Sequence, residues 1–179
     1  GVNGEMRNNL HLIDEHKLLY TAGHCIVGYS TDEKNQFHLA GKDGTEKITA
    51  IAVSKSKKYL AICEKSNKAV CSIYDIHQQK CIRILPDQDI DCHDYQSQEF
   101  LGVTFSPKQE QQYIITLTGA PDGLLILWNW DKLKIVAKIK IGSTSILTAN
   151  NLKADGELDF HGFQVSFNPH DPTCVVVTG

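Results

Sequence analysis

Residues 99–141 contain four short apolar runs separated by turn-forming residues, and this pattern constrains the fold more strongly than any other feature of the sequence. The runs cover 100–105, 113–118, 124–128 and 135–141. Pro107 and Pro121 stand in the first two gaps, where a proline ends a strand because it lacks the N–H that a continuing ladder needs. The runs are too short for isolated helices, and no helical apolar stripe persists through them. This stretch therefore predicts one complete four-stranded antiparallel sheet.

The last run of this unit has the composition of an edge strand. Lysine nearly alternates with aliphatic residues there, and lysine on an edge discourages another chain from pairing with it. The lysines concerned are Lys132, Lys134, Lys138 and Lys140. A stripe that binds nucleic acid or an acidic partner is the functional alternative, but a formal net charge of -3 gives the chain no general basic field. We therefore expect a solvated edge and no nucleic-acid binding.

Imperfect copies of the unit occur on both sides of it. One copy at 48–85 aligns Tyr74-Asp75 with Trp128-Asn129, a weaker copy covers 9–40, and another begins at 163. Repeats of about 40 to 45 residues with four short strands each are typical of WD-type β-propellers, whose sheets need stacked neighbours to bury both faces. A β-sandwich has equally short strands, but the recurring serine- or asparagine-proline turn and the aromatic residue in the third strand favour the propeller.

We therefore predict an all-β fold, an incomplete WD40-type β-propeller with about three four-stranded antiparallel blades plus the first strands of a fourth. The expected blades are 9–40, 48–85, 99–141 and 163–179. A ring of seven such blades would need about 280 to 315 residues, so we expect the chain to be about half of a ring. The two open faces of such a half ring would expose apolar surface.

Composition and cysteine spacing favour a reduced, intracellular protein. With 41% hydrophobic and 22% charged residues the chain has a folded composition, and no apolar run approaches the roughly 20 residues that span a bilayer. Residues 1–7 have no apolar core, so we expect no secretory signal there. We expect no membrane contact. The six cysteines include no C-x-x-C pair, so free thiols are expected. A disulfide between Cys63 and Cys71, which flank one hairpin, is the less favoured alternative.

Two long connectors interrupt the repeats and could serve as partner contacts. The first, 86–98, carries four aspartates and no lysine or arginine, and the second, 142–162, is rich in turn formers. The potential metal ligands in the first connector are Asp89, Asp91, Cys92, His93 and Asp94. Their spacing matches neither an EF-hand nor a zinc site, so a solvated acidic loop is favoured and no metal is expected.

No pattern predicts catalysis or cofactor binding. The segment 41–45, GKDGT, shares only its composition with a phosphate-binding loop and is expected to be a hairpin turn. No G-x-S-x-G motif is present, and the eight histidines lie in no recognisable motif. Trp128 and Trp130 are expected in the blade core and at its rim, respectively, and not as a base-stacking platform. We therefore assign no catalytic, cofactor-binding or metal-binding residues.

Several motifs in succession resemble the cilia- and flagella-associated WD-repeat proteins at their amino-terminal blades. The motifs lie at 9–14 with 24–29, at 58–64 with 73–75, at 127–132, and at 164–169 with 177–179. The resemblance covers nearly the whole chain. It implies paired amino-terminal propellers followed by a coiled coil, in axonemal adaptors near the bases of inner dynein arms. It also implies that residues 1–179 are the first half of a larger propeller domain, the first of the two.

If the resemblance holds, the chain is a non-enzymatic scaffold of the cilium or flagellum that helps to position inner dynein arms on doublet microtubules for motility. Its implied partners are inner dynein arm components, doublet-microtubule-associated proteins and the remainder of its own propeller, and its implied location is the axoneme after a cytoplasmic stage. The alternative is a WD-repeat substrate receptor or adaptor in a ubiquitin ligase or chromatin complex. A propeller-associated hydrolase would need a nucleophile domain in addition.

The sequence also departs from the general WD pattern. Tyr74-Asp75 and Trp128-Asn129 stand where tryptophan-aspartate is usual, no glycine-histidine dipeptide precedes the first strand, and His161-Gly162 near the fourth unit has the reverse order. The resemblance therefore implies an incomplete Asp-His-Ser-Trp network and blade packing that relies more on apolar contact.

Overall fold

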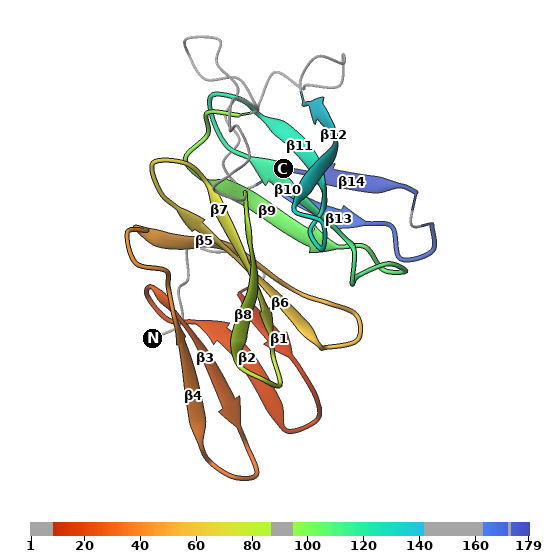
Figure 1. Ribbon diagram of the computed structural model, residues 1–179. Helices are drawn as coiled ribbons and strands as arrows, with labels where there is room; N and C mark the ends of the chain where they lie inside the picture. Colours follow the sequence, from red (N-terminus) through yellow and green to blue (C-terminus); the bar gives the residue numbers. More distant parts are fainter. Residues whose placement is uncertain (1–8, 87–94, 142–162, 172) are drawn as a thin grey trace.

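The computed structural model describes residues 9–86, 95–141, 163–171 and 173–179, which form antiparallel β-sheets and contain no helix (Figure 1). Sheet 1 consists of β1 (Leu10–Leu12), β2 (Lys17–Thr21), β3 (Cys25–Ser30) and β4 (Gln36–Ala40). Sheet 2 consists of β5 (Lys47–Val53), β6 (Tyr59–Lys65), β7 (Val70–Asp75) and β8 (Lys80–Leu85). Sheet 3 consists of β9 (Phe100–Phe105), β10 (Tyr113–Thr118), β11 (Leu124–Asn129) and β12 (Lys134–Lys140). Sheet 4 pairs β13 (Gln164–Phe167) with β14 (Val175–Thr178).

Sheets 1 to 3 are meanders in which each strand pairs with its neighbour in the chain. The middle strands β6 and β10 are buried along nearly their whole length, as their continuous apolar sequences predict. Along the outer strand β12, in contrast, every residue except Ile135 is exposed. The prediction of an all-β, incomplete propeller fold is confirmed by this arrangement.

Sheets 2, 3 and 4 stack through their first strands. Strand β9 contacts both β5 and β13, whereas β8 and β12 form the opposite edges of sheets 2 and 3. This is the radial arrangement of propeller blades. The buried side chains between sheets 1 and 2 include Leu19, Ile26, Leu39, Ile48, Ile51, Leu60 and Ile62. Those between sheets 2 and 3 include Cys71, Ile73, Leu85, Phe100, Phe105, Ile114, Ile126 and Trp128.

The same turn hydrogen bond, positive-φ residue and β-bulge recur in sheets 2 and 3, which explains why the two sequence copies align. In the turn after the third strand, the Asp75 carboxylate accepts from Gln78 N at 2.9 Å, and the Asn129 amide oxygen accepts from Lys132 N at 3.0 Å. The residue at the end of each turn, Gln79 or Leu133, adopts a positive φ of 53° or 54°. Bulges occur at matching places, Ile73/Tyr74 and Leu127/Trp128.

Two expectations from the sequence are wrong. The segment 41–45 connects β4 of sheet 1 to β5 of sheet 2 and is not a hairpin turn, because its flanking strands pair within different sheets. Trp130 lies in a turn but is only 4% exposed, since its ring packs edge-on against Tyr59 of sheet 2 at 5.2 Å between centroids. A turn residue therefore forms part of the core. The residues 87–94 and 142–162 of the two long connectors lie outside the described residues.

Candidate interaction surface

A buried carboxylate joins sheets 1 and 2. Glu64, near the end of β6, has a side chain that is 1% exposed. Its Oε1 accepts hydrogen bonds from Lys42 N and Thr45 Oγ1 at 2.8 Å each and lies 2.8 Å from His24 Nε2. The histidine follows β2, and the other two donors belong to the connector between the sheets. Because a buried charge needs compensating partners, this cluster fixes the connector against both sheets.

Within sheet 3 and its entry segment, two further polar contacts involve tryptophan, serine and aspartate, three residue types of the network that the resemblance implied to be incomplete. The Trp128 indole, fully buried on β11, donates from Nε1 to Thr116 Oγ1 of β10 at 2.9 Å. The Asp122 carboxylate accepts from Ser97 Oγ at 2.8 Å, so a serine before β9 makes this contact. These hydrogen bonds hold the strands of sheet 3 and its entry segment in register. Between sheets 2 and 3, the contacts of the core cluster are apolar.

The thiols of β6 and β7 are structural. Cys63 and Cys71 are directly opposite each other in the register of the two strands, and both are free and fully buried. Burial raises the pKa of the Cys63 thiol well above its ordinary value, and the neighbouring Cys71 raises it further. The thiolate is the reactive form, so this pair has the chemistry of small apolar core residues. The less favoured disulfide is absent between them.

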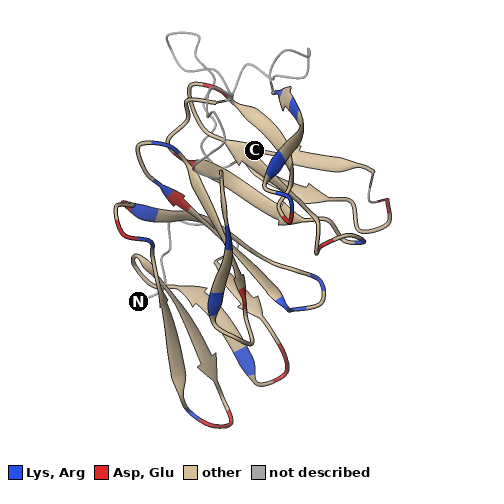
Figure 2. Cartoon of the chain, viewed as in Figure 1, with Lys and Arg blue, Asp and Glu red and all other residues tan. Residues whose placement is uncertain are grey.

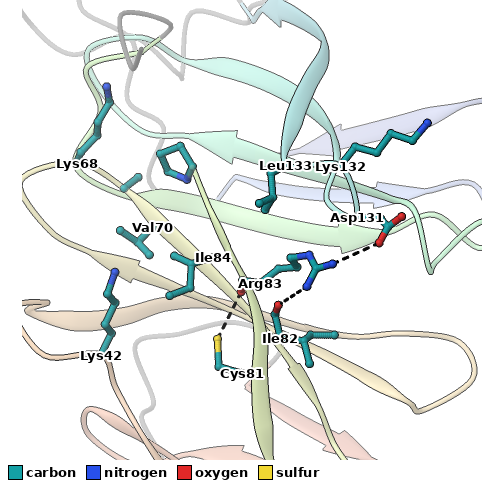
Figure 3. A pocket seen from close by; sticks show the side chains of 12 residues that line it. Lys42, Lys68, Val70, Cys81, Ile82, Arg83, Ile84, Asp131, Lys132 and Leu133 are labelled. Atoms are coloured by element: carbon teal, nitrogen blue, oxygen red, sulfur yellow. Dashed lines mark hydrogen bonds and ion pairs between the residues drawn. The ribbon is translucent and has the colours of Figure 1, made fainter. Parts of the chain in front are cut away.

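A concave surface of about 790 Å³ lies along β8, between sheet 2 and the turn of sheet 3 that contains Leu133 (Figure 3). We call it the outer groove and define it by its lining residues. Its apolar members are Ala69, Val70, Ile82, Ile84, Pro86 and Leu133, and its polar or charged members are Lys42, Lys68, Cys81, Arg83, Asp131 and Lys132. Its walls therefore come from sheet 2, from the connector after sheet 1 and from a turn of sheet 3.

Cationic side chains dominate this groove. Of the residues that the structure describes, four lysine or arginine side chains and one carboxylate, Asp131, line it. The Arg83 guanidinium lies between the two sheets, with Nη1 donating to Ile82 O at 2.8 Å and Nη2 3.7 Å from Asp131 Oδ1 (Figure 3). Because Arg83 and Asp131 are both partly exposed, their pairing contributes little stability. Its effect is to hold the guanidinium in the middle of the groove.

Basic residues also mark the outer edges of these sheets more widely. Strand β8 contains Lys80 and Arg83 and no acidic residue, and β12 contains three lysines and no acidic residue (Figure 2). Of the four edge lysines that the sequence singled out, Lys132 lines the groove and the others lie on β12. Sequence reasoning missed Lys42, Lys68 and Arg83, because they come from three separate segments and only the fold brings them together.

The described part of the chain shows no metal-binding centre and no helix that could cross a membrane. Within the described ranges, no group of three or more His, Cys, Asp or Glu side chains could hold a metal ion. The cluster from Asp89 to Asp94 that was considered in the sequence lies outside those ranges. No helix in the described ranges is long and apolar enough to cross a bilayer.

Comparison with known proteins shows relatives that match the full length of the chain. It is 31% identical over 180 residues to mouse "cilia- and flagella-associated protein 57" and 28% identical over 182 residues to "cilia- and flagella-associated protein 57 C" of Tetrahymena thermophila. It is also 27% identical over 179 residues to mouse "cilia- and flagella-associated protein 44". Each match covers 100% of this chain. No protein-family model matches it.

The relatives are much longer than the region that they share with this chain. The chain spans 13% of the length of the two type-57 proteins and 8% of the length of the type-44 protein. The similarity therefore concerns one stretch of β-sheets in a far larger protein.

Proposed function

This chain is a homologue of the cilia- and flagella-associated proteins along its whole length, and from that premise we propose that it is a non-enzymatic scaffold of the ciliary axoneme. The observation that carries the proposal is the match of the entire chain to relatives of two types. The structure adds a physical reason. Stacked sheets with buried seams form a rigid body, and a rigid body can hold partners at fixed positions on its surface.

We further propose that the chain is part of a longer protein, called the parent protein below, in which the remaining WD-type blades complete the propeller. Relatives in which the shared stretch is 13% or less of the length support this arrangement. Exposed apolar residues on the outer sheets support it as well, since Leu12 of β1 is 65% exposed and Val176 of β14 is 42% exposed. Neighbouring blades would cover such side chains.

The proposed partners are inner dynein arm components and proteins that are bound to doublet microtubules. This finer assignment comes from the resemblance of the motifs described above and from the ciliary names of the relatives. In this role the parent protein keeps inner dynein arms in register along the microtubule and so supports ciliary motility. It reaches the axoneme from the cytoplasm.

Deletion of residues 1–179 from the parent protein in ciliated cells tests this proposal. We expect detergent-extracted axonemes to lose inner dynein arm subunits and to keep outer dynein arm subunits, which serve as the internal control. Quantitative mass spectrometry of the axonemes is the measurement. Unchanged inner-arm content would contradict the positioning role, and absence of the intact parent protein from normal axonemes would contradict the axonemal scaffold itself.

A further inference from the structure

We propose that the outer groove binds an acidic segment of a partner protein, one in which aliphatic side chains stand among the carboxylates. The inference rests on the proposed role as a protein-binding scaffold and adds the surface that binds and the chemistry of its ligand. It depends on how residues from four segments of the chain converge on one hollow. It does not depend on which organelle holds the parent protein.

The charge of the groove selects an anionic ligand. Among the described lining residues there are four cationic side chains, Lys42, Lys68, Arg83 and Lys132, and one carboxylate, although the chain as a whole has a formal net charge of -3. The local excess of positive charge is therefore opposite in sign to that of the whole chain. Clustered cations around a concave surface attract carboxylates and accelerate their encounter with the site.

The floor of the groove is aliphatic, so it favours a ligand that has aliphatic side chains as well as negative charge. Ile82 and Ile84 of β8 are only partly buried, and Val70 and Leu133 stand beside them (Figure 3). A small anion would leave this aliphatic surface in water, whereas a peptide with aliphatic side chains would cover it and gain hydrophobic free energy. A volume of about 790 Å³ is large enough for several side chains of such a peptide.

Protection of a sheet edge does not explain the arrangement. Lysines on β12 protect that edge from pairing with another strand, and Lys80 can do the same for β8. Lys42, Lys68 and Lys132, however, lie in connectors and turns and not on the edge strands. Their side chains surround an apolar hollow, which is an arrangement that edge protection does not require.

The lining favours a protein ligand over a nucleic acid. Single-stranded nucleic acids bind proteins through aromatic side chains on which bases stack, and no aromatic side chain is among the described lining residues. The ring of Tyr95 lies under the Lys68 ammonium group at 5.1 Å, but Tyr95 is only 3% exposed and cannot stack with a base. Aliphatic side chains on the floor match aliphatic side chains of a peptide.

The test uses the purified full-length parent protein and a fluorescein-labelled peptide in which glutamate alternates with valine. Fluorescence anisotropy at low ionic strength gives its affinity. The double variant Lys68→Glu/Lys132→Glu reverses one charge on each wall, and we expect it to weaken binding at least about tenfold because attraction becomes repulsion. The milder variant Lys68→Gln/Lys132→Gln removes the charges and keeps long polar side chains, so a smaller loss is expected.

Matched controls separate the groove from general electrostatics. The variant Lys55→Glu/Lys108→Glu makes the same change of net charge at two exposed lysines outside the groove and should leave the affinity nearly unchanged. A peptide with lysine in place of glutamate should bind far more weakly than the acidic peptide. Circular dichroism of each variant shows that the fold is retained.

Three results would overturn the proposal. The first is that the acidic peptide does not bind. The second is that the groove and control variants weaken peptide binding equally, and the third is that a uridine oligonucleotide binds the same groove more tightly than the peptide at the same salt concentration. The assay uses purified protein, so its outcome is separate from that of the axonemal experiment. If the parent protein binds the acidic peptide in the groove but is absent from axonemes, the proposed axonemal function is rejected and the groove proposal stands.

Discussion

At the scale of single residues, Glu64 shows how a polar side chain fixes the contact between two sheets. Its carboxylate is almost completely removed from water, and three partners from sheet 1 and the following connector compensate for the lost solvation. In the sequence Glu64 is an unremarkable acidic residue after an apolar run. Its partners His24 and Thr45 are 40 and 19 residues away, so only the packed fold shows that they meet.

Replacing this carboxylate should loosen the seam. We expect Glu64→Ala to destabilise the contact between sheets 1 and 2 by about 2–3 kcal/mol, because buried donors lose their acceptor. Hydrogen exchange of the parent protein measures this as faster exchange in β3 and β6. The control Glu46→Ala removes a 61% exposed carboxylate paired with Lys65 and should change stability by less than about 0.5 kcal/mol. Equal effects of the two substitutions would refute the role given to Glu64.

At the scale of elements, the turn between the third and fourth strands is the most regular part of the repeat. A side-chain oxygen at its first position, Asp75 or Asn129, accepts a backbone N–H three residues later, and a left-handed residue completes the turn. The left-handed region disfavours residues with a side chain, and here it is occupied by Gln79 and Leu133. The turns therefore contain strain that glycine would relieve.

This strain predicts a stabilising substitution. Gln79→Gly should stabilise the hairpin of β7 and β8 by about 0.5–1 kcal/mol, because glycine adopts a positive φ without steric cost. The adjacent Gln78→Gly is the matched control and should destabilise by a similar amount, since Gln78 is exposed and is not among the residues with positive φ. Hydrogen exchange of β8 in the parent protein distinguishes the two. A destabilising effect of Gln79→Gly would contradict the strain argument.

The strands themselves could be predicted from the sequence because local chemistry determines them. The run 100–105 became β9 without change, and the run 113–118 became β10, since β-branched and aromatic residues lie between proline-containing turns. The burial of Trp130 could not be predicted in this way. Its sequence position is a turn, and its contact with Tyr59 depends on the stacking of a neighbouring sheet.

The outer groove could not be predicted for the same physical reason. Lys132 was noticed because it belongs to a run of lysines, but Lys68 and Arg83 are isolated in the sequence. Their proximity depends on how sheet 3 lies against sheet 2. Patterns along the chain identify strands and turns, whereas sites formed between sheets require the register and the packing.

At the scale of the whole molecule, the stacked sheets have chemically different sides. Their first strands approach one another and bury apolar side chains, while the outer strands β8 and β12 carry lysine and arginine. Partners that recognise this body are therefore expected at its outer side, where the charged groups and the groove are accessible. A propeller that binds peptides in its central channel would instead be expected to have its charged and aromatic residues near the first strands.

Cross-linking mass spectrometry of isolated axonemes is the most direct test of the proposed scaffold, because it reports both the neighbours of the parent protein and the side that faces them. We expect lysine cross-links from Lys132, Lys134, Lys138 and Lys140 to dynein subunits, tubulin or doublet-associated proteins. Absence of the parent protein from axonemes, together with its recovery with ubiquitin-ligase or chromatin proteins, would contradict the proposed axonemal scaffold.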